Sequence, residues 1–399
     1  MICSFCSLLC DADDLNEIQC DRRTASLVQF ETLRSIKAGL PQLEKQVDAE
    51  LIIVAIESLR AANRILVTGR IASVATARAA VAFAAKYNAT IDCAESGHVF
   101  KNVLAIQRSG LNSVSLAEAR DHSDLFIVVG DDSMLAACPR MPAALSGGKP
   151  NLQTVLLLGD FSAAAAELWK SVGFDAWSVP CDVRTVPSAL AQWSRSSDQS
   201  PSHRSSEMRP TKQLFERMAQ AEYTTIVWSA ENLRIEHADL WVERMLQWIA
   251  GRNETLRCAA LPWSTLDGTF QQVCTWLTGF PGRVAFRDGI PQYDPHGHSY
   301  EQWIARTPIG MSRESIVVLI DETASSTPFL NLVSMQASGK CKIIELTGNS
   351  KCFPTAVAGV EVIADIFRAD QTVLARVSPS HKLVPSIKSA AEWLEGLSQ

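Results

Sequence analysis

Short apolar runs that alternate with helical segments restrict the folds open to this chain more than any other feature. Runs such as "DLFIVVGD", "QTVLLLGD" and "SIVVLIDE" are rich in aliphatic and β-branched residues and end in charged residues. Segments with helical periodicity, such as residues 71–87 and 162–171, lie between these runs. Strands that are apolar on both faces must be covered on both faces. The sequence therefore predicts an α/β fold with doubly wound, mostly parallel sheets.

The chain is expected to divide around one polar segment. Residues 194–213 are rich in Ser, Pro and charge and lack an apolar period, so they are interpreted as a linker or long loop. The predicted division is a Cys-rich segment at 1–50, a first α/β domain at 51–193 and a second at 214–399. Ligand sites of such sheets lie at the carboxyl ends of strands. The informative loops therefore begin near Gly130, Gly159, Ser229, Pro262, Asp321 and Thr347.

Composition excludes several classes of function. The formal net charge is −6 and the isoelectric point is near 5.7. The chain therefore lacks the positive charge that would attract nucleic acid or anionic lipid. The apolar stretches are too short to cross a bilayer, and no membrane association is expected. An odd number of cysteines, eleven, spread through apolar contexts suits a reducing cytoplasm better than a disulfide framework.

Four cysteines lie within the first twenty residues. Cys3, Cys6 and Cys10 form C-x2-C-x3-C, and Cys20 follows after nine further residues. Three close thiolates and a later fourth can hold an iron-sulfur cluster, whereas structural zinc more often uses two separated C-x-x-C pairs. The spacing predicts a [4Fe-4S] cluster, with a zinc-binding or vestigial knuckle as the alternative.

Several segments carry a family resemblance. "CSFCSLLCDAD" near the start, "ATIDCAESGHVFKN" in the first half and "FQQVCTWLTGFP" in the second half resemble the B subunits of formylmethanofuran dehydrogenase, a family of the molybdopterin oxidoreductase superfamily. The resemblance is closest to the B subunit of the bacterial formyltransferase/hydrolase complex. It implies a molybdopterin-oxidoreductase-like fold with a small N-terminal cysteine-rich knuckle.

The chain departs from this family where the cofactor binds. His98 stands where the family has a Cys or selenocysteine ligand of molybdenum or tungsten, and Asp131 and Asp132 stand where it has Cys and Asn. The nucleotide-binding turns of the family are replaced by "LLGDFSA" at 157–163 and "LTGNSKC" at 346–352. These changes predict a degenerate pterin site without bound molybdopterin, and no catalytic residue is assigned.

By resemblance, the chain is expected to act in tetrahydromethanopterin-linked one-carbon metabolism, in a complex that passes a formyl group to a methanofuran-type carrier and releases formate. Its partners would be the A, C and D subunits, with this chain as a noncatalytic scaffold. Two alternatives remain open. One is an active molybdenum or tungsten formylmethanofuran dehydrogenase subunit, an oxidoreductase, and the other is an unrelated iron-sulfur electron carrier.

Overall fold

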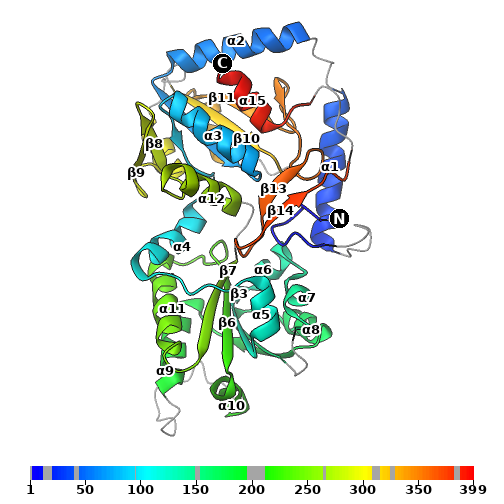
Figure 1. Ribbon diagram of the computed structural model, residues 1–399, viewed down its shortest axis with the longest axis vertical. Coiled ribbons are helices and arrows are strands. Elements are labelled where there is room, and N and C mark those ends of the chain that lie inside the picture. Colours follow the sequence, from blue (N-terminus) through cyan, green and yellow to red (C-terminus); the bar gives the residue numbers. More distant parts are fainter. Residues whose placement is uncertain are drawn as a thin grey trace. The chain divides into compact units, whose positions relative to one another are not determined.

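The computed structural model describes residues 2–11, 20–39, 45–94, 96–148, 153–195, 212–263, 267–307, 315–323, 329–381 and 387–399. The chain folds into two compact units (Figure 1). Unit 1 combines Met1–Gly97 with Thr265–Gln399, and unit 2 is His98–Ser264. Each unit is therefore described by itself.

Unit 1 contains a seven-stranded sheet, sheet 1, in which strands from both ends of the chain lie side by side. In spatial order its strands are β12 (Phe353–Pro354), β11 (Lys342–Thr347), β10 (Ser315–Asp321), β1 (Arg64–Arg70), β2 (Thr90–Ile91), β8 (Val284–Arg287) and β9 (Ile290–Tyr293). The strands from β12 to β2 run parallel, whereas β8 and β9 are antiparallel to their neighbours. Every residue of β10 is buried, as expected of a strand inside a parallel sheet.

Helices cover both faces of sheet 1. On one face lie α3 (Val74–Lys86), α12 (Asp267–Thr278) and α15 (Ala390–Leu397), whose Phe83, Phe270 and Trp393 share one apolar core with the strands. On the other face α13 (Tyr300–Ala305) and α14 (Leu330–Ala337) pack against Leu66 and Leu319. The Ser73 side chain caps the start of α3 by accepting the Thr76 amide, and a capping box begins α15.

The N-terminal segment packs onto a small hairpin of unit 1. The hairpin joins β13 (Ala364–Phe367) and β14 (Leu374–Val377) in antiparallel pairing, and the turn at residues 2–11 adds Leu9 to its apolar core. Next in the chain come α1 (Asp21–Gly39) and α2 (Lys45–Ala61). The buried Lys37 of α1 donates to the buried Glu361 at 2.5 Å, which attaches α1 to the segment before the hairpin.

Unit 2 contains a five-stranded, fully parallel sheet, sheet 2. In spatial order its strands are β5 (Asp175–Pro180), β4 (Thr154–Asp160), β3 (Leu125–Asp131), β6 (Tyr223–Ser229) and β7 (Arg257–Trp263). The chain builds β4 and β5 on one side of β3 and then returns to build β6 and β7 on the other side. This reversal is the doubly wound topology, and it leaves a switch point between β3 and β6.

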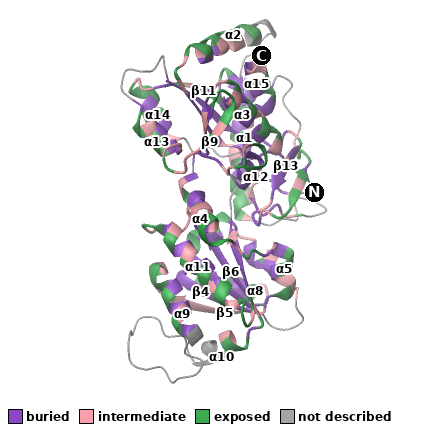
Figure 2. Ribbon diagram, turned by 60° about the vertical axis from the view of Figure 1, so that its left-hand side comes forward, coloured by how far each residue is buried: buried purple, intermediate pink, exposed green. Residues whose placement is uncertain are grey.

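Helices cover both faces of sheet 2 as well. Helices α4 (Ser96–Ser109), α9 (Val186–Arg195) and α11 (Ala238–Arg252) pack on one face around Trp193, Trp241 and Met245. Helices α5 (Leu116–His122), α6 (Asp132–Ala137), α7 (Met141–Leu145) and α8 (Ala163–Ser171) lie on the other side (Figure 1). The strands β3, β4 and β6 between them are mostly buried, whereas β5 at one side of the sheet is half-buried (Figure 2). A short turn, η2 (Val183–Thr185), precedes α9, and α10 (Lys212–Gln220) precedes β6.

The predicted α/β fold with doubly wound, mostly parallel sheets is confirmed. The division of the chain differs from the predicted boundaries 1–50, 51–193 and 214–399, because β1 pairs with β10 and β3 pairs with β6. Residues 196–211 of the predicted linker lie outside the described residues. In the described part of the chain, no helix is both long and apolar enough to span a bilayer.

Candidate functional site

At the switch point of sheet 2, polar side chains link the ends of β3 and β6. Asp131 ends β3, and its carboxylate caps α6 by accepting the Ser133 amide at 2.9 Å. The Ser133 hydroxyl donates to Asp131 and accepts from the Asn232 side-chain amide, which lies in the loop after β6. The two predicted residues Asp131 and Asp132 thus lie at the edge where a dinucleotide would bind in this topology.

The neighbouring acidic residues also make bonds within unit 2. Asp132 accepts the Ser162 amide at 3.0 Å, which links α6 to the loop after β4. Asp160 ends β4 in register with Asp131 and is exposed. This edge therefore presents three carboxylates and is the more solvated of the two sheet edges.

His98 lies in the first turn of α4, in unit 2, and its side chain is exposed. Its ring Nδ1 is 3.5 Å from the Nζ atom of Lys101. Lys101 donates to the Leu233 carbonyl oxygen at 2.7 Å, and partial burial lowers the pKa of its ammonium group. The structure therefore gives His98 a basic neighbour.

Sheet 1 ends in a buried ion pair. Arg70 closes β1, Asp321 closes β10, and these two residues are in register. The Arg70 Nη1 atom lies 2.9 Å from Asp321 Oδ2, with side-chain exposures of 14% and 9%. Burial raises the pKa of Asp321, while the guanidinium of Arg70 opposes this shift. Arg70 also stacks on the ring of Phe329, with its guanidinium carbon 4.5 Å from the ring centroid.

Glu322 follows Asp321 directly, and its side chain turns toward the start of α3. Its side chain is buried, and its Oε2 atom accepts the backbone amides of Ala72 and Ser73, both at 3.0 Å. Its Oε1 atom accepts the hydroxyls of Ser73 at 2.9 Å and Thr76 at 2.6 Å. Burial raises the pKa of Glu322, and the hydrogen bonds from Thr76 and Ser73 oppose this shift.

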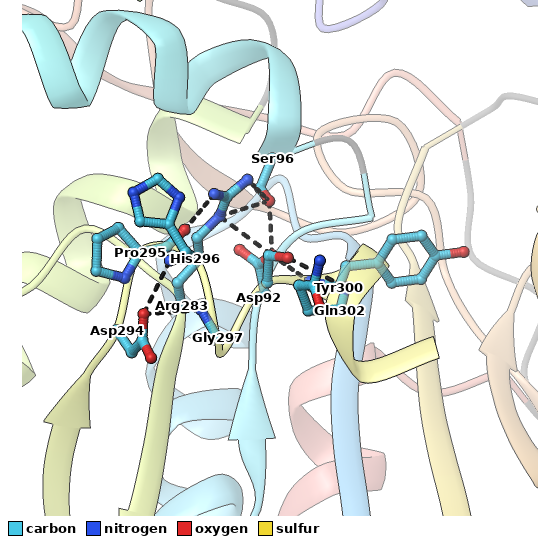
Figure 3. A network of polar contacts seen from close by, with 10 residues as sticks. Asp92, Ser96, Arg283, Asp294, Pro295, His296, Gly297, Tyr300 and Gln302 are labelled. Atoms are coloured by element: carbon cyan, nitrogen blue, oxygen red, sulfur yellow. Dashed lines mark hydrogen bonds and ion pairs between the residues drawn. The ribbon is translucent and has the colours of Figure 1, made fainter. Parts of the chain in front are cut away.

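A third buried carboxylate follows β2 (Figure 3). Asp92 is fully buried, and its Oδ2 atom accepts the Ser96 hydroxyl at 2.6 Å and the Tyr300 amide at 2.8 Å. The Arg283 Nε atom is 3.7 Å from the same oxygen, and Arg283 also donates to Ser96 and to the Pro295 carbonyl oxygen. This network joins the end of β2 to the starts of α4 and α13.

Desolvation raises the pKa of Asp92 to about 7, although Arg283, Ser96 and Tyr300 favour the charged form. Among the described residues, its Oδ1 atom has no hydrogen-bond partner, which favours the neutral acid. Asp92 can therefore gain or lose a proton near neutral pH. Its complete burial keeps it from external molecules in this structure, so its role here is to hold elements of unit 1 together.

Of the four predicted thiol ligands, Cys3, Cys6 and Cys10 lie in the N-terminal turn of unit 1. The Cys3 amide donates to the Cys10 carbonyl oxygen at 2.8 Å, and Cys20 directly precedes α1. Burial raises the pKa of Cys3. Within the described residues, no group of three or more His, Cys, Asp and Glu side chains forms a metal site. Residues 12–19 lie outside the described part of the chain.

Sequence reasoning missed the roles of Glu322, Asp92 and Arg283. Asp92 directly follows an apolar run in "ATIDC", and Glu322 lies one residue beyond the run in "VVLIDE"; this position at a strand end was the signal in the sequence. Arg283 lies directly after the segment "FQQVCTWLTGFPG", which carried part of the family resemblance.

No family model matches this chain, and no curated protein matches it. Among solved structures, the fold is similar to a chain in the X-ray crystal structure of the formyltransferase/hydrolase complex (FhcABCD) from Methylorubrum extorquens in complex with methylofuran. The TM-score is 0.71 at 18% sequence identity, and the match covers 90% of this chain and 97% of the other. At this identity the comparison establishes a shared fold.

Proposed function

We propose that this chain is a B-type subunit of a formyltransferase/hydrolase complex in one-carbon metabolism, where it serves as a noncatalytic scaffold. The similarity of fold to a chain of that complex, over 90% of this chain and 97% of the other, is the observation that carries the proposal. The A, C and D subunits are its partners, and the assembled complex binds a methanofuran-type carrier. The proposal includes a cytoplasmic location for the chain and its complex.

The edge of sheet 2 supports a noncatalytic role. A molybdopterin dinucleotide carries phosphates, which in doubly wound folds bind to amides and basic groups at the switch point. Here Asp131, Asp132 and Asp160 gather at that edge, and carboxylates repel phosphates. Asp131 and Asp132 are also bonded to backbone amides of their own unit. The residues at this edge do not fit the dinucleotide, so His98, Asp131 and Asp132 are interpreted as remnants of a degenerate site.

The spacing of the N-terminal cysteines in the sequence supports a bound [4Fe-4S] cluster, with a zinc-binding or vestigial knuckle as the alternative. Cys3, Cys6, Cys10 and Cys20 would be the ligands, as thiolates, and the cluster would supply electron-transfer capacity when bound. The hydrogen bond from the Cys3 amide to the Cys10 carbonyl oxygen closes the turn that carries three of these thiols. Iron and sulfide analysis of anaerobically purified protein tests this assignment. Stoichiometric zinc without iron would establish the alternative.

Purification of the tagged chain from its host tests the scaffold role. We expect the A, C and D subunits to copurify, with neither pterin nor molybdenum or tungsten bound to this chain. Coexpression with the C-type subunit should raise the soluble yield and the Tm, because obligate partners stabilise each other by mass action. Stoichiometric molybdenum or tungsten with pterin would instead identify an active dehydrogenase subunit. A chain that is equally soluble and stable alone would contradict the scaffold role.

A further inference from the structure

The start of α3 follows the first strand of sheet 1, and in doubly wound folds such a helix start commonly binds an anion. Helix α3 follows β1 directly, and the chain continues from α3 to β2 on one side while β10 lies on the other. In such a βαβ unit, the helix N-terminus at the switch point offers amide donors and a positive dipole end to a ligand phosphate.

A carboxylate of the chain itself occupies this place. Glu322 accepts the amides of Ala72 and Ser73 and the hydroxyls of Ser73 and Thr76, at 2.6–3.0 Å. The Glu322 side chain is buried, with 2% of the residue exposed. Two backbone amides and two side-chain hydroxyls therefore donate to this one carboxylate. None of these four donors is left to bind a phosphate.

The backbone beside this carboxylate leaves little room for a second group. Gly69 has φ +130°, and a Cβ atom there would lie 1.8 Å from the Ile320 carbonyl oxygen. Strands β1 and β10 thus approach closely just before Arg70 and Asp321. Glu322 follows this contact directly, and its side chain reaches the residues at the start of α3.

We propose that Glu322 is a built-in anion that takes the position of a ligand phosphate at the N-terminus of α3. Unit 1 is stabilised by its own carboxylate there and binds no phosphate-bearing ligand at that position. The donor set is specific for a small oxyanion, so a free oxyanion binds once the carboxylate is removed. This inference goes beyond the proposed function and does not depend on membership of a complex.

Replacement of Glu322 by Ala tests the proposal, because it deletes a fragment with the size and charge of acetate. We expect Glu322→Ala to lower the Tm of the full chain, and acetate or inorganic phosphate to restore it saturably by about 3 °C or more at constant ionic strength. The wild-type protein should show no such rise, because its site is filled.

Two variants serve as controls. Glu322→Gln removes the charge but keeps the site filled, so its lowered Tm should not respond to acetate. Leu66→Ala, in the core of β1, lowers the Tm without exposing donors and should also show no response. The triple change Ser73→Ala, Thr76→Val and Glu322→Ala removes both hydroxyl donors and should weaken the rescue at least tenfold in anion concentration.

The outcomes separate clearly. Saturable stabilisation of Glu322→Ala by either anion, absent from the wild type and both controls, supports the proposal. Equal responses of all variants, or no response of Glu322→Ala, overturn it. If Glu322→Ala does not fold in chloride, its refolding yield is compared in acetate, phosphate and chloride. Recovery only in the oxyanions supports the proposal, and failure in all three overturns it.

Discussion

The carboxyl edges of the two sheets place charged side chains in register in two different ways, one as an ion pair and the other as two like charges. At the edge of sheet 1, Arg70 and Asp321 are in register, oppositely charged and largely buried. At the edge of sheet 2, Asp131 and Asp160 are in register and carry the same charge, and Asp160 is exposed. A buried charge needs a partner because water no longer solvates it, whereas like charges near water are screened. Burial therefore decides which side chains each edge tolerates.

The backbone beneath the two edges is nevertheless the same. Gly69 in β1 and Gly159 in β4 each precede the last strand residue, with φ of +130° and +135°. A Cβ atom would lie 1.8 Å from the Ile320 oxygen in sheet 1 and 1.9 Å from the Gly130 oxygen in sheet 2. The two units thus share the same backbone conformation at these strand ends and differ in the side chains that follow.

The largest effect should come from breaking the ion pair of sheet 1. Replacing Arg70 with Met leaves Asp321 buried without its cation and removes the contact with the ring of Phe329. We expect the free energy of unfolding to fall by about 3–5 kcal/mol, as measured by urea denaturation. A loss below about 1 kcal/mol would mean that water reaches Asp321 and that the two edges do not differ in burial.

The second effect depends on pH and comes from Asp92, at the same edge of unit 1. Its pKa is about 7 in the folded protein and 3.8 ordinarily, so between these values the folded protein holds a proton that the unfolded chain releases. The free energy of unfolding therefore falls as pH rises through this window, by up to about 4 kcal/mol, and is constant above it. Asp92→Asn removes this pH-dependent contribution. The stability of the variant relative to the wild type should therefore rise as the pH rises from 4 to 8.

Asp294→Asn is the matched control for Asp92. The amides of Gly297 and His296 lower the pKa of Asp294, so its contribution to stability is present above its ordinary pKa and is lost only at lower pH. Its difference from the wild type should be constant between pH 5 and pH 8. A constant difference for Asp92→Asn over the same range would show that Asp92 is charged in the folded protein.

The sequence predicted the strands and the doubly wound class of fold better than it predicted the buried site. The run "DLFIVVGD" marks β3, because a strand buried on both faces leaves a local apolar pattern. Asp131 and Asp132, which follow this run, were singled out by the family resemblance. Glu322 and Asp92 also follow apolar runs, but what covers them comes from far along the chain. The amide that reaches Asp92 belongs to Tyr300, 208 positions away, and no local pattern encodes that contact.

The pairing of β1 with β10 escaped prediction for the same reason. These strands are separated by the whole of unit 2, and each one alone looks like any other buried parallel strand. Long-range pairing depends on how whole units pack. A division of the chain into consecutive domains was therefore the natural expectation from local patterns.

A smaller effect is expected at the edge of sheet 2, from Asp131. Its carboxylate caps α6 by accepting the Ser133 amide. Asp131→Ala should cost about 1 kcal/mol in the free energy of unfolding. Asp131→Asn retains a capping oxygen and should cost only a few tenths of a kcal/mol. Equal losses for the two variants would assign the effect to the charge of Asp131 and not to the cap.

The smallest effect, and the sharpest test of the contrast between the edges, comes from Asp160. Its exposed carboxylate lies in register with Asp131, so the two like charges repel each other weakly through water. Asp160→Asn should raise the free energy of unfolding by about 0.2–0.5 kcal/mol at low salt. This gain should vanish in 1 M salt, where the Debye length is about 3 Å. The cost of Arg70→Met should persist under the same conditions, because salt does not enter a buried pair. A salt-independent gain from Asp160→Asn would show that the edge of sheet 2 is also shielded from solvent.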